Sequence, residues 1–312
     1  MVTMIKGAIL YKKHHNINQN QMMDGIKERI CGNRFIDLND DIEIIEKKLD
    51  LLDVDFLIAW YYKEDLIKLK PLKRLGIPII MTSDDPWGRL FSEDYKNIVD
   101  YHDVNGVILQ TKNTELAFRK YLNKKINFFW LPWGINPNIM KDYKEEKIWD
   151  ISISGKFSSY EWRRKLNSIL YNYKRYHRIP RILPPDRSWE DYARDLNKSR
   201  ISLGGCHQST DKLYYKNIFI GETFSKTLEI PACNTCLINT NFADKELLGF
   251  KDGENFIEFN SIQEFKKKIK FYLKNIEELE RITQNGYDLV HKNYTINQQV
   301  DRLKKEIIDI YG

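Results

Sequence analysis

The chain has 312 residues, which is long for one domain and comfortable for two. Hydrophobic residues make up 42% and aromatic residues 13%, so the chain buries enough apolar surface to fold and is not disordered. The net charge of +6 is uneven: the segment 162–187 holds eight Lys/Arg and one acidic residue, a local charge of +7. The rest of the chain is therefore close to neutral, and this basic segment calls for an explanation.

Composition also bounds the cellular location. The first residues lack the charged-then-apolar layout of a secretion signal. Four cysteines in a chain of this size predict a reducing compartment rather than a disulfide framework. No apolar run reaches the length of about eighteen residues that a membrane span needs. We therefore expect a cytoplasmic protein without a transmembrane segment.

The first half of the chain alternates short apolar runs with longer segments of helical periodicity. Strands are predicted at residues 7–11, 34–37, 54–60, 77–82, 106–110 and 128–131, and helices at 21–30, 41–51, 63–75 and 113–122. Alternating strands and helices are typical of a parallel sheet covered by helices on both faces.

A second alternating series follows the charged stretch 141–147, which we interpret as a linker between domains. Strands are predicted at 149–154, 179–183, 200–203 and 235–239, helices at 159–176, 189–196, 225–232, 262–273, 276–291 and 296–310, and a long polar loop at 204–223. We expect an N-terminal Rossmann-like domain at 1–143 and a C-terminal one at 144–312, with the last helix as a candidate to pack back on the first domain. In such doubly wound sheets ligands bind where strands end and helices begin.

The most informative local motif is the segment 224–238, in which a loop leads into a predicted helix that carries Ser225, Lys226, Thr227 and Glu229. Free amides at a helix start, together with a lysine, suit a diphosphate. A carboxylate one turn further along can accept two hydroxyl hydrogen bonds, as a ribose diol requires. The alternative is an ordinary surface helix with Ser225 as its N-cap.

Several segments in order resemble the CgeB-like branch of the group 1 (family 4-like) glycosyltransferases, which have the GT-B fold. The resemblance covers most of the chain from residue 54 to 295. It rests on Lys226-Thr-Leu-Glu-Ile-Pro-Ala-Cys233, Asp252-Gly-Glu-Asn-Phe-Ile257, Gly76-Ile-Pro-Ile-Ile-Met-Thr-Ser-Asp-Asp-Pro86, Leu131-Pro-Trp-Gly-Ile-Asn-Pro137, and Asp150-Ile-Ser-Ile-Ser-Gly155 with Arg163 and Arg164 beyond it. The order and spacing of these segments carry the resemblance, since none is specific alone.

The resemblance implies two Rossmann-like domains facing a central crevice and a hexosyltransferase-like enzyme with a nucleotide-sugar donor. UDP is the commonest donor nucleotide among such relatives, so a UDP-sugar is expected. Glu229 stands where the family holds the donor ribose, and Lys226 where a basic residue faces the phosphates. Gly155 and Lys156 form the turn under the diphosphate, and Arg163 is near enough to serve it. Ser225 and Thr227 complete the donor-binding set.

Two departures from the family pattern stand out. The related pattern of two glutamates separated by seven residues requires an acid at position 221, which is Gly221, and Glu222 is displaced by one residue. Asn234 replaces the glycine that follows the alanine-cysteine pair of the family. The first departure puts a second carboxylate contact to the sugar in doubt, and the second suggests a different turn after the helix.

Catalytic and acceptor-side candidates come from the first half. Asp84 and Asp85 follow a predicted strand, where a carboxylate could accept the proton of an acceptor hydroxyl, although Asp-Asp-Pro also favours a turn. His14 and His15 follow the first strand and are candidates for an acceptor or phosphate contact, with simple solvation as the alternative. Arg187, just beyond two prolines, is a further candidate phosphate contact.

A metal site or cofactor is not expected. Cys233 and Cys236 form a C-x-x-C pair without a second pair nearby, since only Cys206 and His207 could join them, so we interpret them as buried thiols. The donor sugar is a substrate, and lysine, arginine and helix dipoles can neutralise its departing diphosphate without an ion.

Two other functions stay open at this stage. The basic segment 162–187, with tyrosines among its charges, is compatible with a nucleic-acid-binding protein, and a protein that binds a nucleotide-sugar without turnover is the third possibility. Within the segment, Lys174, Arg175 and Arg178 are predicted at the far end of a helix, where they complement its dipole and suit peripheral contact with an anionic surface. The acceptor, which could be a hydroxyl of a glycan, a protein, a lipid-linked molecule or a nucleic acid, is not indicated.

Overall fold

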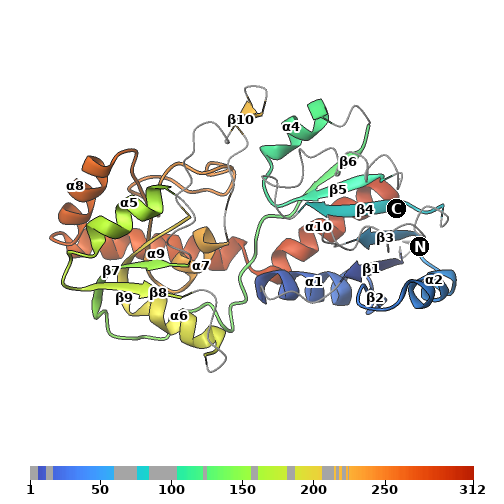
Figure 1. Cartoon of the computed structure of the whole chain (residues 1–312), viewed down its shortest axis with the longest axis horizontal. Coiled ribbons are helices and arrows are strands. Elements are labelled where there is room, and N and C mark those ends of the chain that lie inside the picture. The colour runs from blue at the N-terminus through green and yellow to red at the C-terminus, as the bar shows by residue number, and fades with distance from the viewer. Residues whose placement is uncertain are drawn as a thin grey trace. The chain divides into compact units, whose positions relative to one another are not determined.

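A computed structural model describes residues 6–11, 17–59, 76–83, 104–121, 125–155, 161–180, 187–205, 214–215, 218–219, 223 and 225–312. The chain divides into two compact units, each with its own parallel sheet (Figure 1). The first unit comprises residues 1–132 and 296–312, and the second comprises residues 133–295. His14, His15, Asp84, Asp85 and Lys156 lie outside the described residues.

The first unit contains a six-stranded parallel sheet in the order β2-β1-β3-β4-β5-β6. Its elements are β1 (Gly7–Tyr11), α1 (Ile17–Arg29), β2 (Phe35–Asp37), α2 (Ile42–Asp50), β3 (Phe56–Ala59), β4 (Ile79–Ser83), β5 (Gly106–Leu109), α4 (Thr114–Tyr121), β6 (Asn127–Trp130) and α10 (Ile296–Tyr311). The helix predicted at 63–75 falls outside the described residues. The predicted parallel sheet is confirmed, and its strands lie within about two residues of their expected bounds.

Alternation along each strand sends successive side chains into two separate cores, one on each face of this sheet. Leu10 packs with the cluster that α2 and α4 cover, whereas Ile9 packs with the cluster that α1 and α10 cover. Because both faces are buried, the strands are nearly continuous apolar runs rather than alternating ones.

The last helix, α10, packs along α1 in the first unit (Figure 1). Gly25 permits this close approach, since a methyl group added there would lie 3.2 Å from side-chain carbons of both Ile296 and Val300. At the end of α1, the Arg29 guanidinium binds both carboxylate oxygens of Asp301 at 2.6 and 2.7 Å. A helix that is distant in sequence therefore completes the core of the first unit.

The second unit contains a five-stranded parallel sheet in the order β13-β12-β9-β7-β8. Its elements are β7 (Trp149–Ser154), α5 (Glu161–Leu170), β8 (Tyr176–Ile179), α6 (Trp189–Asn197), β9 (Ser199–Leu203), β10 (Tyr214–Tyr215), β11 (Ile218–Phe219), α7 (Lys226–Ala232), β12 (Cys236–Asn239), β13 (Ile257–Glu258), α8 (Ile262–Tyr272) and α9 (Ile276–Asn293). In Figure 1, α5 and α8 cover one face of this sheet and α6 covers the other.

The helix predicted at 159–176 is wrong in its second half. α5 ends at Leu170, a turn follows, and β8 begins at Tyr176 and pairs with β7. The turn is fixed by Tyr173, which packs on the core beneath α5 and α8. Lys174 and Arg175 therefore lie in a turn and Arg178 lies on a strand, so their predicted role in complementing a helix dipole is also wrong.

Three short strands escaped prediction. β13 has two residues and is an edge strand, while β10 and β11 form a small antiparallel pair inside the predicted long loop. Segments this short contain too few residues for a recognisable period.

Candidate functional site

The carboxyl edge of the second sheet begins with the turn after β7. Gly155 has a φ of +88°, a left-handed conformation that favours glycine. Its amide donates to the Ile179 carbonyl at 3.0 Å, which ties the turn to the end of β8. The sequence therefore places a glycine at the point where the backbone has to turn sharply out of the sheet.

Arg163 lies beside this turn. It projects from α5, is 1% exposed, and donates from Nη2 to the backbone carbonyl of Ser154, the last residue of β7. A guanidinium that is almost fully buried needs polar partners to offset its desolvation. The structure thus holds one fixed positive charge within hydrogen-bonding distance of the β7 turn.

Helix α7 carries three of the four donor-binding candidates of the segment 224–238, namely Lys226, Thr227 and Glu229. Ser225 immediately precedes it, and every residue of its single short span is buried. Ser225 has helical backbone angles and its side chain makes no capping hydrogen bond. The alternative interpretation, a capped surface helix, is therefore wrong.

Lys226 and Glu229 lie one turn apart on α7 and so share one side of the helix. Lys226 is 7% exposed and Glu229 is 0% exposed. Lysine and glutamate are rarely buried to this extent, because removing their charges from water is costly. Two oppositely charged side chains at this depth are characteristic of a site built for a polar ligand.

A chain of hydrogen bonds joins Glu229 to the edge of the sheet. The hydroxyl of Tyr192 donates to Glu229 Oε2 at 3.0 Å. The same hydroxyl is 2.7 Å from Ser154 Oγ. Three elements, β7, α6 and α7, therefore converge on one buried polar chain at the carboxyl edge of the sheet.

Sequence reasoning missed Tyr192. Its position in the helix predicted at 189–196 belongs to the apolar stripe that includes Ala193 and Leu196, so it looked like an ordinary core residue. One signal was present, since a buried tyrosine needs a hydrogen-bond partner for its hydroxyl.

Two buried hydroxyl groups in this region have no protein partner in the described part of the chain. They are Thr227 Oγ1 on α7 and Thr240 Oγ1 directly after β12. Buried polar atoms almost always have a partner, and exceptions call for a ligand or an ordered water. Both hydroxyls are thus available for a bound molecule.

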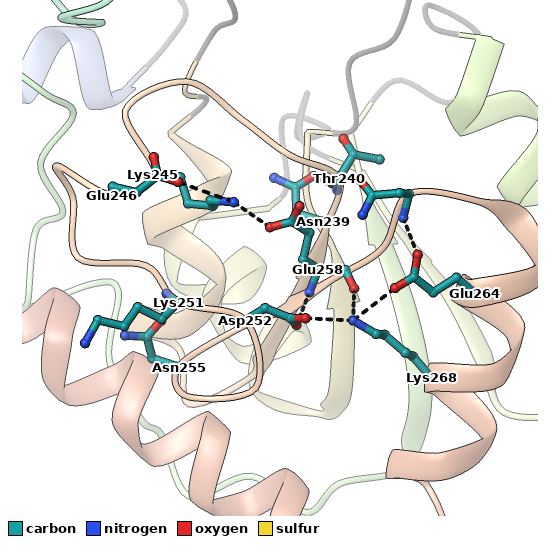
Figure 2. Close-up of polar contacts among 11 residues, drawn as sticks. Asn239, Thr240, Lys245, Glu246, Lys251, Asp252, Asn255, Glu258, Glu264 and Lys268 are labelled. Carbon is teal, nitrogen blue, oxygen red and sulfur yellow. Dashed lines mark hydrogen bonds and ion pairs between the residues drawn. The ribbon is translucent and has the colours of Figure 1, made fainter.

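Ion pairs brace the neighbouring ends of β12 and β13, as Figure 2 shows. Lys245 Nζ lies 2.7 Å from Glu258 Oε2, and Lys268 Nζ lies 2.8 Å from Asp252 Oδ2. Burial disfavours the charged form of Lys245, but the hydrogen bonds and charges of Glu258 and Glu246 together outweigh burial and raise the pKa of the lysine. Because every charge in this group is paired within the group, we assign the Asp252-to-Ile257 segment a structural role.

Arg187 forms an ion pair with Asp195 of α6 at 2.5 Å. The next residue, Ser188, starts α6 with a capping box in which its Oγ accepts from the Asp191 amide and the Asp191 carboxylate accepts from the Ser188 amide. Of the predicted donor-binding residues that the structure describes, Gly155, Arg163 and Glu229 are linked through Ser154 and Tyr192. Arg187 is engaged separately, at the start of α6.

The basic segment 162–187 is divided among several sites. Arg175 donates to the backbone carbonyls of Ile148 and Lys147, both at 2.8 Å, and so holds the chain that leads into β7. Arg163 is buried and Arg187 is paired, as described above. These three arginines do not contribute to one continuous basic surface.

The C-x-x-C pair is buried. Cys233 and Cys236 are free thiols, and burial raises the pKa of Cys236 to about 12. Cys233 Sγ lies 3.8 Å from Met140 Sδ, in a sulfur-rich core contact. Among the residues that the structure describes, no three His, Cys, Asp or Glu side chains gather as a metal site would require.

The turn after α7 keeps a left-handed backbone although asparagine replaces glycine. Asn234 has a φ of +50°, and asparagine tolerates this conformation better than other residues with a Cβ. Its carbonyl accepts from Lys147 Nζ at 2.5 Å, which also donates to the Ser199 carbonyl at 3.1 Å. Burial lowers the pKa of Lys147 to about 8.

The family model for glycosyl transferase-like proteins matches residues 138–305, which is more than half of the chain. The match covers nearly all of the second unit, including the β7 turn, α6 and α7. None of the curated proteins matches the chain in sequence.

Solved structures show the same fold at low sequence identity. Anabaena Alr3699/HepE in complex with UDP matches with a TM-score of 0.67 and 10% identity over 98% of this chain and 100% of that chain. Sucrose-phosphate synthase from Thermosynechococcus elongatus matches with a TM-score of 0.64 and 11% identity over 97% and 99%. A glycosyltransferase from Rickettsia africae matches with a TM-score of 0.60 and 10% identity over 98% of each chain. These neighbours are GT-B glycosyltransferases, so the predicted GT-B fold class is confirmed.

No helix in the described residues is both long enough and apolar enough to cross a lipid bilayer.

Proposed function

We propose that this chain, which belongs to the glycosyl transferase-like family, transfers a sugar from a UDP-sugar to an acceptor hydroxyl without a metal ion. Family membership makes it a glycosyltransferase, and the donor nucleotide and the independence from metal are what the proposal adds. The UDP assignment is supported by Anabaena HepE, a protein of the same fold that has been solved with UDP and with UDP-glucose.

The observation that carries the proposal is the buried Glu229 carboxylate, oriented by Tyr192 at the carboxyl edge of the second sheet. In open α/β sheets, ligands bind at this edge. A carboxylate only accepts hydrogen bonds, and the two neighbouring hydroxyls of a ribose are donors at matching spacing. We therefore assign Glu229 to the donor ribose.

The diphosphate is assigned to the side chains and backbone near Glu229. Lys226 supplies a positive charge one turn away, and Ser225 and Thr227 supply hydroxyls at the start of α7. Gly155 in the β7 turn and Arg163 beside it are assigned to the diphosphate as well, together with Lys156, the residue that follows Gly155 in the sequence. α7 is too short for its dipole to dominate, so the proposal depends on these side chains.

Departure of the diphosphate develops negative charge on the leaving oxygen. Fixed cations in a site that excludes water stabilise that charge, and this can replace the contribution of a metal ion. Lys226 and Arg163, both almost fully buried, are the groups proposed for this role.

Acceptor activation is assigned to the first half of the chain. We propose Asp85, with its neighbour Asp84, as the general base that takes the proton of the acceptor hydroxyl. His14 and His15 are proposed acceptor contacts.

A cytoplasmic location is proposed as well, because Cys31, Cys233 and Cys236 are free, buried thiols, as is typical of a reducing compartment.

Hydrolysis and transfer assays test this function. Purified protein is incubated with UDP-glucose, UDP-galactose or UDP-N-acetylglucosamine, with and without a panel of glycoside acceptors, and each reaction is run both with and without EDTA. Release of UDP that increases with an acceptor and persists in EDTA is the expected result. Binding of these donors without any release of UDP would show a nucleotide-sugar-binding protein instead, and loss of turnover in EDTA would contradict metal independence.

A further inference from the structure

The direction of each hydrogen bond in the chain from Ser154 to Glu229 follows from the chemistry of its members. A tyrosine hydroxyl has one proton, and Tyr192 donates it to Glu229 Oε2 at 3.0 Å. The contact of 2.7 Å between Tyr192 and Ser154 must therefore be a bond that Ser154 Oγ–H donates to the tyrosine oxygen. The proton order is thus Ser154 to Tyr192 to Glu229.

The tyrosine itself is held firmly. It is 0% exposed, and its ring meets Trp189 edge-on, with ring centroids 5.3 Å apart. The capping box at Ser188 fixes the start of α6, one turn before the tyrosine. Ser154 is held by the parallel pairing of β7 with β8 and β9. Neither Tyr192 nor Ser154 can shift without moving secondary structure.

A rigid donor on one carboxylate oxygen sets the rotation of the whole carboxylate. Loss of this donor removes one restraint on the terminal torsion of the Glu229 carboxylate, which has a broad energy profile. A diol binds most tightly when the two carboxylate oxygens lie in one plane facing the two hydroxyls that donate to them. The orientation of Glu229 therefore decides how strongly each ribose hydroxyl contributes to binding.

We propose that Tyr192 is a positioning residue that makes the donor site select ribonucleotides over deoxyribonucleotides. The proposal rests on the assignment of Glu229 to the donor ribose, and it adds the group that makes this contact specific. Ser154 supports the tyrosine by donating to its oxygen, so that the hydroxyl proton points to Glu229.

Calorimetric titration of UDP and 2′-deoxy-UDP into wild type, Tyr192→Phe and Tyr176→Phe tests this proposal. Tyr176→Phe is the matched control, because it also removes one hydroxyl with a side-chain partner in the second unit, Asn167 Oδ1 at 2.6 Å. Thermal unfolding of each variant shows whether it is folded at the titration temperature.

Wild type is expected to bind UDP at least about tenfold more tightly than 2′-deoxy-UDP, the effect of one hydrogen bond to a charged group. Tyr192→Phe is expected to weaken UDP binding about fivefold to tenfold and to change 2′-deoxy-UDP binding by less than about twofold, so that the preference shrinks. Tyr176→Phe should leave both affinities unchanged. A purely structural tyrosine would weaken both ligands equally.

The two possible failures are separable. Equal wild-type affinity for UDP and 2′-deoxy-UDP would remove the ribose assignment of Glu229, and the present inference with it. A wild-type preference that persists unchanged in Tyr192→Phe would overturn only the role of Tyr192. If Tyr192→Phe does not fold, Ser154→Ala takes its place, with a smaller loss of preference as the supporting result and an unchanged preference as the contrary one.

Discussion

Replacing Glu229 by glutamine is the most informative single change in the second unit. The substitution keeps the size of the side chain and an oxygen that can accept from Tyr192. It exchanges the second acceptor oxygen for an amide that only donates, and it removes the negative charge. A ribose hydroxyl that donates to that oxygen in the wild type loses its partner.

The expected magnitude follows from the kind of bond that is lost. A hydrogen bond to a charged group contributes about 1.5–3 kcal/mol, which corresponds to roughly a 10-fold to 150-fold rise in the dissociation constant for UDP. The free energy of unfolding should change by less than about 1 kcal/mol, because the tyrosine keeps its acceptor. Glu229→Ala, which removes that acceptor as well, should destabilise the protein by about 1–3 kcal/mol.

Isothermal titration with UDP gives the affinity, and urea denaturation gives the stability. Glu280→Gln provides the control, because Glu280 is an exposed glutamate on α9. Wild-type affinity for UDP in Glu229→Gln would refute the reasoning, since it would show that the carboxylate does not contact the ribose.

Three further changes test other parts of the structure. Burial depresses the pKa of Lys147 to about 8, so between about pH 8 and 10.5 the unfolded chain binds more protons than the native one. Urea titrations should therefore show that the free energy of unfolding of wild type rises by about 2–3 kcal/mol relative to that of Lys147→Met as pH rises through this window. A difference between the two proteins that does not change with pH would contradict the burial argument. Gly286→Ala brings a methyl group to 2.6 Å from a backbone carbonyl of the loop before β13, where α9 packs on α7. The free energy of unfolding of this variant, measured in urea, should be lower than that of wild type by about 1–3 kcal/mol. An unchanged value would mean that α9 can move away from α7 and this loop without cost. Arg163→Met leaves the last carbonyl of β7 without its guanidinium partner and should lower both stability, by about 1–3 kcal/mol, and UDP affinity. A variant as stable as wild type would show that the buried arginine does not hold the turn.

Most strands of both sheets could be predicted, because they are short apolar runs ended by a polar residue or a glycine. β1 and β7 were predicted at the bounds that the structure shows. The helix predicted through residue 176 failed for a physical reason. β8 is an edge strand with a polar sequence, Tyr-His-Arg-Ile, and its strand conformation comes from pairing with β7, which local periodicity does not record.

The candidate site was predictable only in part. Lys226, Thr227 and Glu229 stand out because they adjoin one another in a segment that resembles a known family. Tyr192 is 37 residues away from Glu229 along the chain, and only the parallel arrangement of β7, β9 and β12 brings α6 and α7 together. The partner of a buried hydroxyl is a tertiary contact, so a single sequence gives the need for a partner and not its identity.

The basic segment 162–187 likewise shows that a single sequence does not give the tertiary partners of its side chains. Its charges are adjacent in sequence, but the structure sends Arg163 into the core, Arg175 to the backbone before β7 and Arg187 to Asp195. A local charge of +7 is therefore not a measure of one basic surface.

The central claim is that the second unit binds a uridine nucleotide through Glu229. Calorimetric titration of the wild-type protein with UDP, ADP and GDP, each repeated with Glu229→Gln, tests it most directly. We expect UDP to bind most tightly and its affinity to fall at least about tenfold in the variant. Tighter binding of ADP or GDP, or equal binding of UDP by wild type and variant, would contradict the claim.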